Sequence, residues 1–363
     1  MCVAGNTIKL KDFSRLRIDQ LLSEGYFRSG KSMFHCPVTF LDGTANTTIR
    51  TRLNLDGHKY RKSSRKLLAT NKQIFTSGFF PLDLDEEVLD LYELYKKECF
   101  KGDLSGELDD WLTGSFGKEI FETQMCKIYN NGQLVAVSFL DIGAKAVASI
   151  MGIYHPDFRK YSLGIYSMLL EVEYAKGLGM EFYYPGYILS QSPRFEYKKK
   201  VGNLEFLRFT ENKWYPLEEL NYEDHLVEKT IDQLKSLKRY LKNFMIKSEL
   251  YTYPLFSWNS YPLNANLLEH YFFLRIMIPG YTTLFIAITY NGIEECYQLN
   301  IANSIGKSSP TWKEFTNYYP EKGNWLDTIL IQQKGSKLET STSIPFILMN
   351  LIGKLGKSSD EEE

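Results

Sequence analysis

Residues 148–197 read ASIMGIYHPDFRKYSLGIYSMLLEVEYAKGLGMEFYYPGYILSQSPRFEY, and this stretch decides the fold. It predicts a strand over Ala146–Tyr154, a loop, a helix over Leu163–Lys176 and a strand over Met180–Leu189 before a polar exit. Such a βαβ-like unit places the N-terminus of the helix beside the end of a strand. That position suits an acceptor or an activated acyl group, because the first turn of a helix presents N–H groups.

The predicted helix is apolar on most of its sides, which indicates that it is buried. Ser162 is expected to be its N-cap and Gly177 its C-cap. Gly164 lies in the first turn, either because helix and strand pack closely or because a ligand approaches the bare backbone. Glu171 lies on the narrow polar face, where it either bonds to the end of a strand or accepts a proton.

A Pro185-Gly186 pair interrupts the second strand, which we expect to be the last strand of the sheet. Proline removes a hydrogen-bond donor from the ladder, so the pair predicts a bulge or a splay. A splay opens a cleft between neighbouring strands. The next segment brings cations to the exit of this cleft, namely Arg194, Lys198, Lys199 and Lys200.

An antiparallel meander is predicted before this unit. Thr123–Tyr129 runs into the turn Asn130-Asn131-Gly132, and Leu134–Ile142 forms the returning strand. Ala146–Tyr154 completes the meander. Three helices are predicted upstream: Leu16–Ser23, which Gly25 ends, and Leu84–Lys97 and Leu108–Phe116, which we assign to packing.

Positive charge gathers in the first third of the chain. The turn after the first helix carries Arg28 and Lys31. The alternating strand Thr47–Asn54 has a cationic face that includes Arg50 and Arg52.

A basic run over His58–Asn71 follows, with Lys59, Arg61, Lys62, Arg65 and Lys66. One interpretation is a solvated helix face, which most charge runs are. The other is a patch that binds a phosphate backbone, because adjacent cations repel each other until an anion neutralises them. Tyr60 and the arginine strand favour the second interpretation.

The composition limits the classes of function. The chain has 363 residues, enough for two or three domains, and 43 Lys+Arg against 44 Asp+Glu, so a polyanion needs a local patch. Five scattered cysteines without C-x-x-C spacing, and no apparent signal peptide, favour a reducing cytoplasm. No apolar run approaches the ~20 residues that span a membrane.

The C-terminal third carries the fewest motifs. Glu223–Ser248 is expected to be a helix, and β-like segments lie within Tyr251–Tyr297 and Thr328–Phe346. We expect a small α/β or mostly β extension that ends in the acidic tail Ser358–Glu363. Isolated His225, His270 and Cys296 are assigned to core or surface positions.

Two families resemble the central unit. CoA-dependent N-acetyltransferases of the GNAT fold carry R/Q-x-x-G-x-G/A at the helix start, where it holds pyrophosphate. Arg159 to Gly164 resembles this motif, with Ser162 in place of the first glycine. The pyrophosphate-binding motif for CoA therefore lacks one of its two glycines.

The chain resembles the arginyl- and leucyl-tRNA–protein transferases of the N-degron pathway more closely, over roughly Leu21–Leu220. The residues that carry this resemblance are Tyr154-His155-Pro156-Asp157, Tyr161-Ser162-Leu163-Gly164, Leu170-Glu171, Tyr183-Tyr184-x-Gly186-Tyr187-Ile188, Pro193-x-x-x-Tyr197-Lys198, Trp214-x-Pro216, Gly25-x-x-Arg28-Ser29-Gly30 and the basic run.

The resemblance implies a mixed α/β (α+β) protein with a GNAT-like acyltransferase fold. It implies a basic N-terminal region at 1–80, an aminoacyl-transferase domain at 81–220 and a C-terminal extension at 221–363. It also implies transfer of an amino acid, with arginine favoured over leucine, from aminoacyl-tRNA to proteins with acidic N-termini, which marks them for degradation.

Roles for individual residues follow from the resemblance together with the chemistry of the side chains. Glu171 and Tyr187 are the candidates to accept or relay the proton of the amine. The substrate-binding candidates are Arg28, Lys31, Ser162, Gly164, Tyr183, Tyr184, Gly186, Tyr197 and Lys198. The tRNA-binding candidates are Arg50, Arg52, Arg61, Lys62, Arg65 and Lys66.

The chain departs from the family at several positions. His155, Ser192 and Phe195 stand where the family usually has Asp, Cys and Met. The N-terminal cysteine cluster is reduced to Cys2 and Cys36, and two thiols cannot complete a four-cysteine site. We therefore expect no metal and no cofactor, with aminoacyl-tRNA as co-substrate, and no membrane or DNA partner.

Two alternatives stay open at this point. One is a CoA-dependent N-acyltransferase of the same fold. The other is a non-catalytic relative that binds RNA or protein N-termini.

Overall fold

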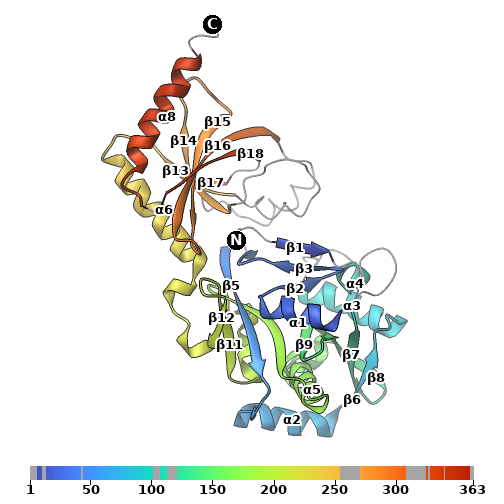
Figure 1. Cartoon of the computed structure of the whole chain (residues 1–363). Helices are drawn as coiled ribbons and strands as arrows, with labels where there is room; N and C mark the ends of the chain where they lie inside the picture. The colour runs from blue at the N-terminus through green and yellow to red at the C-terminus, as the bar shows by residue number, and fades with distance from the viewer. Residues whose placement is uncertain are drawn as a thin grey trace. The chain divides into compact units, whose positions relative to one another are not determined.

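The computed structural model describes residues 6–9, 14–41, 44–100, 107–112, 121–253, 270–307, 324–325, 328–338 and 340–359. The chain forms two compact units (Figure 1). The larger unit contains residues 7–35 and 49–220, and the smaller unit contains residues 1–6, 36–48 and 221–363. Residues 49–80 thus belong with 81–220, while the division into three domains at 80 and 220 stays a prediction.

A nine-stranded sheet runs in the order β12-β11-β5-β10-β9-β8-β7-β6, with β4 beside β5. The strands are β4 (Val38–Leu41), β5 (Thr44–Asn54), β6 (Thr76–Pro81), β7 (Thr123–Asn130), β8 (Gln133–Ile142), β9 (Ala146–Tyr154), β10 (Phe182–Leu189), β11 (Leu204–Arg208) and β12 (Lys213–Pro216). A three-stranded sheet is formed by β1 (Asn6–Lys9), β3 (Ser32–His35) and β2 (Phe27–Ser29).

The predicted meander is confirmed, because β7, β8 and β9 pair antiparallel in sequence order. Its first turn places Asn131 at φ 50° and Gly132 at φ 86°. Two consecutive left-handed residues match the twist of the strands that they join, which is why Asn-Gly is a strong hairpin signal.

The position predicted for the second strand is wrong. β10 is an inner strand, since β5, β11 and β12 lie beyond it in the sheet. The alternating strand Thr47–Asn54 falls within β5, which lies between β10 and β11 and is buried along most of its length. A strand with neighbours on both edges and cover on both faces has no exposed cationic face.

The helices and 3₁₀ segments of the larger unit are α1 (Arg15–Ser23), α2 (Lys62–Ile74), α3 (Glu86–Phe100), α4 (Leu108–Leu112), α5 (Leu163–Gly177), η1 (Pro156–Tyr161), η2 (Pro193–Val201) and η3 (Leu217–Glu219). The end of the predicted helix Leu108–Phe116 lies outside the described residues.

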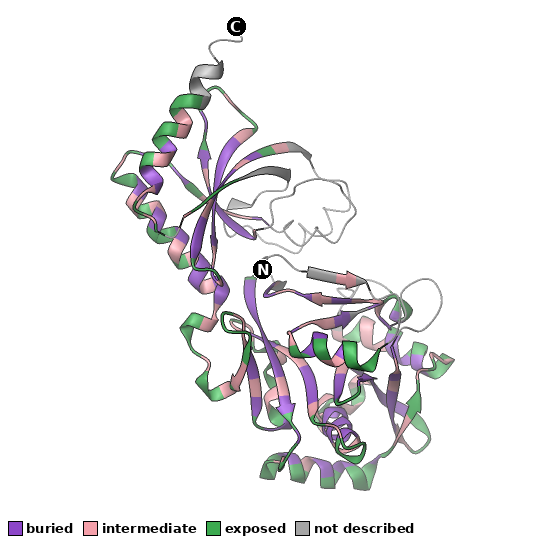
Figure 2. Ribbon diagram, viewed as in Figure 1, coloured by how far each residue is buried: buried purple, intermediate pink, exposed green. Residues whose placement is uncertain are grey.

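Helix α5 is buried along most of its length, as predicted (Figure 2). Its side chains pack in one apolar core with strands β7 to β10. Leu169 and Val172 of α5, for example, are 0% exposed. Ser162 is the N-cap residue, as predicted, but at φ 52° it makes no side-chain cap bond. The predicted C-cap is wrong, because Gly177 is the last helical residue, Leu178 is the C-cap, and the left-handed residue is Gly179 at φ 71°.

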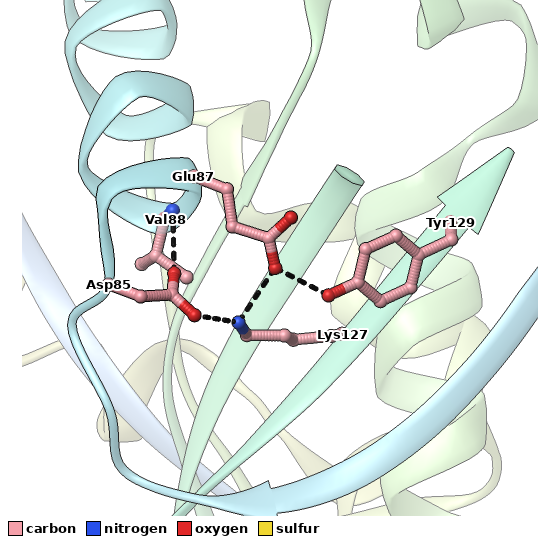
Figure 3. Close-up of polar contacts among 5 residues, drawn as sticks. All are labelled: Asp85, Glu87, Val88, Lys127 and Tyr129. Carbon is pink, nitrogen blue, oxygen red and sulfur yellow. Dashed lines mark hydrogen bonds and ion pairs between the residues drawn. The ribbon is translucent and has the colours of Figure 1, made fainter. Parts of the chain in front are cut away.

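A polar cluster fastens the start of α3 to β7 (Figure 3). The Lys127 ammonium on β7 donates to Asp85 Oδ2 at 2.5 Å and to Glu87 Oε1 at 2.9 Å. Asp85 also accepts from the Val88 N–H, and the Tyr129 hydroxyl donates to Glu87. Because Lys127 is buried, its charge needs both carboxylates, and α3 therefore has the packing role that we expected.

The smaller unit has a six-stranded sheet of its own, in the order β17-β13-β14-β15-β16-β18. Its elements are η4 (Tyr222–Asp224), α6 (Leu226–Lys242), β13 (Glu249–Thr252), β14 (Phe272–Met277), β15 (Leu284–Asn291), β16 (Cys296–Lys307), β17 (Asn324–Trp325), β18 (Thr328–Leu338) and α8 (Ile344–Ser359). Helices α6 and α8 pack against the sheet in one apolar core. The sequence pattern had not predicted α8.

Candidate functional site

Strands β9 and β10 pair for only a short distance. Parallel pairs join Phe182, Tyr183 and Tyr184 to residues 146–148 of β9. Pro185 follows, and Gly186 adopts φ 96°. The predicted interruption is confirmed. We call the region where the two strands no longer pair, beyond Ala148 and Tyr184, the β9–β10 fork.

Glu171 extends from α5 toward the strands at the fork and is 0% exposed. The Tyr183 hydroxyl donates to its Oε2 at 2.7 Å, while Oε1 has no hydrogen-bond partner among the described residues. Burial raises the pKa of Glu171 to about 7, although the hydroxyls of Ser138, Tyr183 and Ser149 lower it. The carboxyl group therefore bonds to a strand residue, which is the first of the two sequence interpretations, while its role as a proton acceptor stays a prediction.

Lys198 reaches the same region from η2, which packs against β10 and α5. Its Nζ lies 5.3 Å from the ring centre of Tyr187 and 4.9 Å from that of Phe195. Burial and, to a lesser extent, the Arg50 charge lower the pKa of Lys198 to about 7, and Glu171 opposes both effects.

Arg50 lies beside Tyr187 rather than on an exposed strand face. Its Cζ is 3.7 Å from the ring centre of Phe27 and 5.1 Å from that of Tyr187. Arg50 is only 3% exposed. The structure thus brings four predicted site residues to one region from four different elements, namely Glu171 of α5, Tyr187 of β10, Lys198 of η2 and Arg50 of β5.

Arg52 is held inside the protein by other partners. Its Nε donates to Glu205 Oε2 at 2.6 Å, and its Cζ lies 4.2 Å from the ring centre of Phe182 and 4.5 Å from that of Trp214. Tyr184 packs edge-on against the same Trp214. Neighbouring residues of a strand face opposite ways, so Tyr183 meets Glu171 while Tyr184 lies in another core cluster.

Arg28 is also engaged within the protein. Its guanidinium forms an ion pair with Asp141 of β8 at 2.5 Å and donates to Thr123 Oγ1 at 2.7 Å. The side chains of Arg28 and Asp141 are 4% and 2% exposed. Breaking such a pair leaves an uncompensated buried charge, so the main effect of Arg28 is on stability. Lys31 lies in the turn of the β2–β3 hairpin and is half-buried.

The start of α5 is open around Gly164. A Cβ placed there would meet no atom within 4 Å, which excludes close helix–strand packing as the reason for the glycine. Ser162, in its left-handed conformation, joins η1 to α5. Tyr197 of η2 is 37% exposed, and burial together with the Glu171 charge raises the pKa of its hydroxyl to about 12.

The basic run forms the loop before α2 and the first turns of this helix. Lys62, Arg65 and Lys66 are exposed, and Arg61 Nη2 donates to Asn203 Oδ1 at 3.1 Å. The opposite face of α2 is buried through Ser64, Leu68 and Asn71.

Tyr60 does not extend this basic surface. Its hydroxyl donates to the Leu169 carbonyl oxygen of α5 at 3.1 Å, so the ring packs inward.

Sequence reasoning missed several residues around the site. Ser138 and Ser149 act on Glu171, and the ring of Phe27 lies against Arg50; no motif distinguishes any of them. The ring of Phe195, one of the three departures from the family, lies against Lys198. The other two departures are His155 and Ser192.

Both departures supply cap acceptors. The His155 Nδ1 atom accepts from the Asp157 N–H, and Ser192 Oγ accepts from the Arg194 N–H. His155 thereby performs the N-capping that an aspartate performs.

Among the residues that the structure describes, no three His, Cys, Asp or Glu side chains gather as a metal site. Cys2 lies outside the described ranges, and the Cys36 thiol donates to the Val38 carbonyl oxygen at 2.7 Å. Within the same ranges, no helix has the length and apolar character to cross a membrane.

We predict opposite effects for alanine at two glycines of the site. Gly186→Ala should destabilise the protein by about 1–2 kcal/mol, because a side chain disfavours a left-handed backbone. Its methyl group would also lie 3.0 Å from Lys198 Nζ. Gly164→Ala is the matched control, and it should leave stability unchanged or raise it by up to about 1 kcal/mol. Urea denaturation measures both, and equal stabilities would contradict the role of Gly186.

Comparison with known proteins links this geometry to one family. The family model described as "Arginine-tRNA-protein transferase, C terminus" matches residues 87–208. These residues contain α5, β10 and η2, and hence most of the fork.

Curated relatives carry a related name. An aspartate/glutamate leucyltransferase of Leptospira interrogans is 28% identical over 153 residues, covering 41% of this chain and 59% of the relative. One of Xylella fastidiosa is 26% identical over 206 residues, covering 54% and 78%. The chain thus spans less than two thirds of the first relative's length.

Among solved structures, the C-terminal domain of a putative lysylphosphatidylglycerol synthetase from Agrobacterium fabrum has a TM-score of 0.32. It is 10% identical over 40% of this chain and 47% of the other, which is too distant for a functional argument. The family model and the curated relatives agree with each other, and residues 87–208 of this chain match the aminoacyl-tRNA–protein transferase family.

Proposed function

We propose that this protein transfers an amino acid from aminoacyl-tRNA to the N-terminal α-amine of proteins that begin with Asp or Glu. The observation that carries the proposal is the family match over residues 87–208, which contain Glu171, Tyr187 and Lys198. The names of the curated relatives supply the acidic acceptor. We further propose that the larger unit is a GNAT-like acyltransferase domain and that modification marks the acceptor for degradation.

The reaction is aminolysis of an ester. The acceptor nitrogen attacks the carbonyl carbon of the aminoacyl ester, the C–N bond forms, and the C–O bond to the tRNA ribose breaks. The ester is already activated, so no covalent enzyme intermediate is required. Effective molarities of about 10⁵–10⁸ M are reached when two reactants are held in the best geometries, and positioning therefore supplies much of the rate.

The residues of the fork suit the remaining steps. The amine must lose a proton, and a carboxyl group with a pKa of about 7 accepts one near neutral pH, so Glu171 is the proposed proton acceptor, with Tyr187 as the relay. Protonated Lys198 is suited to pair with the acidic side chain of the acceptor. The unpaired part of β10 offers a place for an extended N-terminus to add as a strand.

The donor amino acid is proposed from two considerations. The sequence resemblance favoured arginine, whereas the curated relatives are named for leucine. We therefore propose leucine as donor.

The first experiment measures transfer directly. The full-length protein is incubated with radiolabelled Leu-tRNA or Arg-tRNA and a peptide that begins with Asp. We expect label in the peptide, more of it from Leu-tRNA. If neither tRNA transfers label to the peptide, the proposal is wrong. Label from acetyl-CoA instead favours the acyltransferase alternative, and tight tRNA binding without transfer favours a non-catalytic relative.

The basic surface of α2 gives a second test. Reversing the charges of Lys62, Arg65 and Lys66 to Glu should weaken tRNA binding and reduce its salt slope by roughly 2–3, since each lost phosphate contact removes about one unit. The matched control reverses two lysines and one arginine exposed on α6, namely Lys235, Arg239 and Lys242. An equal effect of both triple variants would identify α2 as an ordinary solvated helix.

The pH dependence of transfer tests Glu171. If ionised Glu171 accepts the proton, the rate rises with pH through about 7. The Tyr183 hydrogen bond lowers the pKa of Glu171, so Tyr183→Phe should raise that pKa and move the rise to higher pH. Tyr184→Phe is the control, because Tyr184 faces away from Glu171. Identical pH profiles for the wild type and both variants would show that Glu171 does not accept the proton.

A further inference from the structure

Two cations approach the ring of Tyr187 at the fork. Arg50 Cζ lies 5.1 Å from the ring centre and Lys198 Nζ lies 5.3 Å from it. The face of an aromatic ring attracts cations within about 6 Å, so Tyr187 gives both groups a favourable contact. The charges nevertheless repel each other, and after burial the charge of Arg50 is the largest cause that lowers the pKa of Lys198.

The position of Arg50 is firmly fixed. β5 is an inner strand, and Phe27 of β2 covers the guanidinium at 3.7 Å. His35 of β3 also feels the charge of Arg50, and burial together with this charge lowers the pKa of His35 to about 4. His35 is therefore neutral at neutral pH, and Arg50 is the base that keeps a permanent charge there.

Arg52 is the matched residue on the same strand. It too is stacked on two aromatic rings, and its Nε lies 2.6 Å from Glu205 Oε2. Those two rings are Phe182 and Trp214, whereas Arg50 lies against the ring of Tyr187, which a second base, Lys198, also approaches. Lys198 is half-buried.

We propose that Arg50, through Tyr187 and Lys198, determines the specificity of the fork for the side-chain carboxylate of an N-terminal Asp or Glu. Lys198 makes the contact, and Arg50 is a positioning residue that orients the Tyr187 ring and adds a permanent positive charge. An anion stabilises two neighbouring cations, whereas the neutral amides Asn and Gln do not. The inference rests on the proposed function, and it replaces the expectation that Arg50 binds tRNA.

The experiment compares full-length wild type with Arg50→Gln, Arg50→Lys, Lys198→Met and Arg52→Gln. Acceptor peptides begin with Asp, Asn, Glu or Gln, and the aminoacyl-tRNA is saturating. Arg50→Gln should lower kcat/KM for Asp and Glu peptides about tenfold, mostly through KM, and change it little for Asn and Gln peptides. Arg50→Lys should retain most of the preference, because it keeps the charge.

Two variants complete the design. Arg52→Gln is the matched control and should keep the Asp/Asn ratio of the wild type. Lys198→Met should lose the preference as Arg50→Gln does, and it keeps the test decisive if Arg50→Gln fails to fold in a thermal melt. The Arg50 and Lys198 variants together test whether each of the two cations beside the Tyr187 ring contributes to the preference for acidic peptides.

The outcomes separate the inference from the function on which it rests. A wild type that transfers from no tRNA overturns the proposed function and the inference with it. A wild type that prefers acidic peptides, with Arg50→Gln or Lys198→Met variants that keep that preference, overturns the inference alone. An equal loss for all four peptides, or a loss of tRNA affinity with an unchanged Asp/Asn ratio, also overturns it.

Discussion

The end of pairing between β9 and β10 is the constraint on which the site depends. Pro185 has no N–H to donate, and Gly186 at φ 96° turns the strand away from regular geometry. Because the strands no longer pair beyond Ala148 and Tyr184, η2 can pack against both β10 and α5. Lys198 therefore lies beside Tyr187 and within the electrostatic influence of Glu171.

Burial gives these groups their chemical character. Removing a charge from water disfavours the ionised form, so the same effect raises the pKa of Glu171 and lowers that of Lys198. Both values reach about 7, whereas exposed groups of these types titrate far from neutrality. The hydrogen bond from Tyr183 lowers the pKa of Glu171, and the charge of Arg50 lowers the pKa of Lys198.

The residues of the fork all lie in one of the two units of the chain. The family match at 87–208 lies wholly in the larger unit, together with every residue of the fork. The smaller unit has a separate apolar core formed by its own sheet with α6 and α8. Its residues after 220 lie outside the family match, and the residues proposed to carry the chemistry lie in the larger unit.

The sequence by itself determined the features that depend on neighbouring residues. Turn chemistry located the Asn131-Gly132 hairpin, apolar periodicity located α5, and the Pro185-Gly186 pair located the fork. Tertiary structure alone decided that β5 lies inside the sheet, that Arg50 meets Tyr187 and that Arg28 pairs with Asp141. The physical reason is distance along the chain. A cation has the same local pattern whether a carboxylate, an aromatic ring or water surrounds it, and only the order of strands far apart in sequence selects among these surroundings.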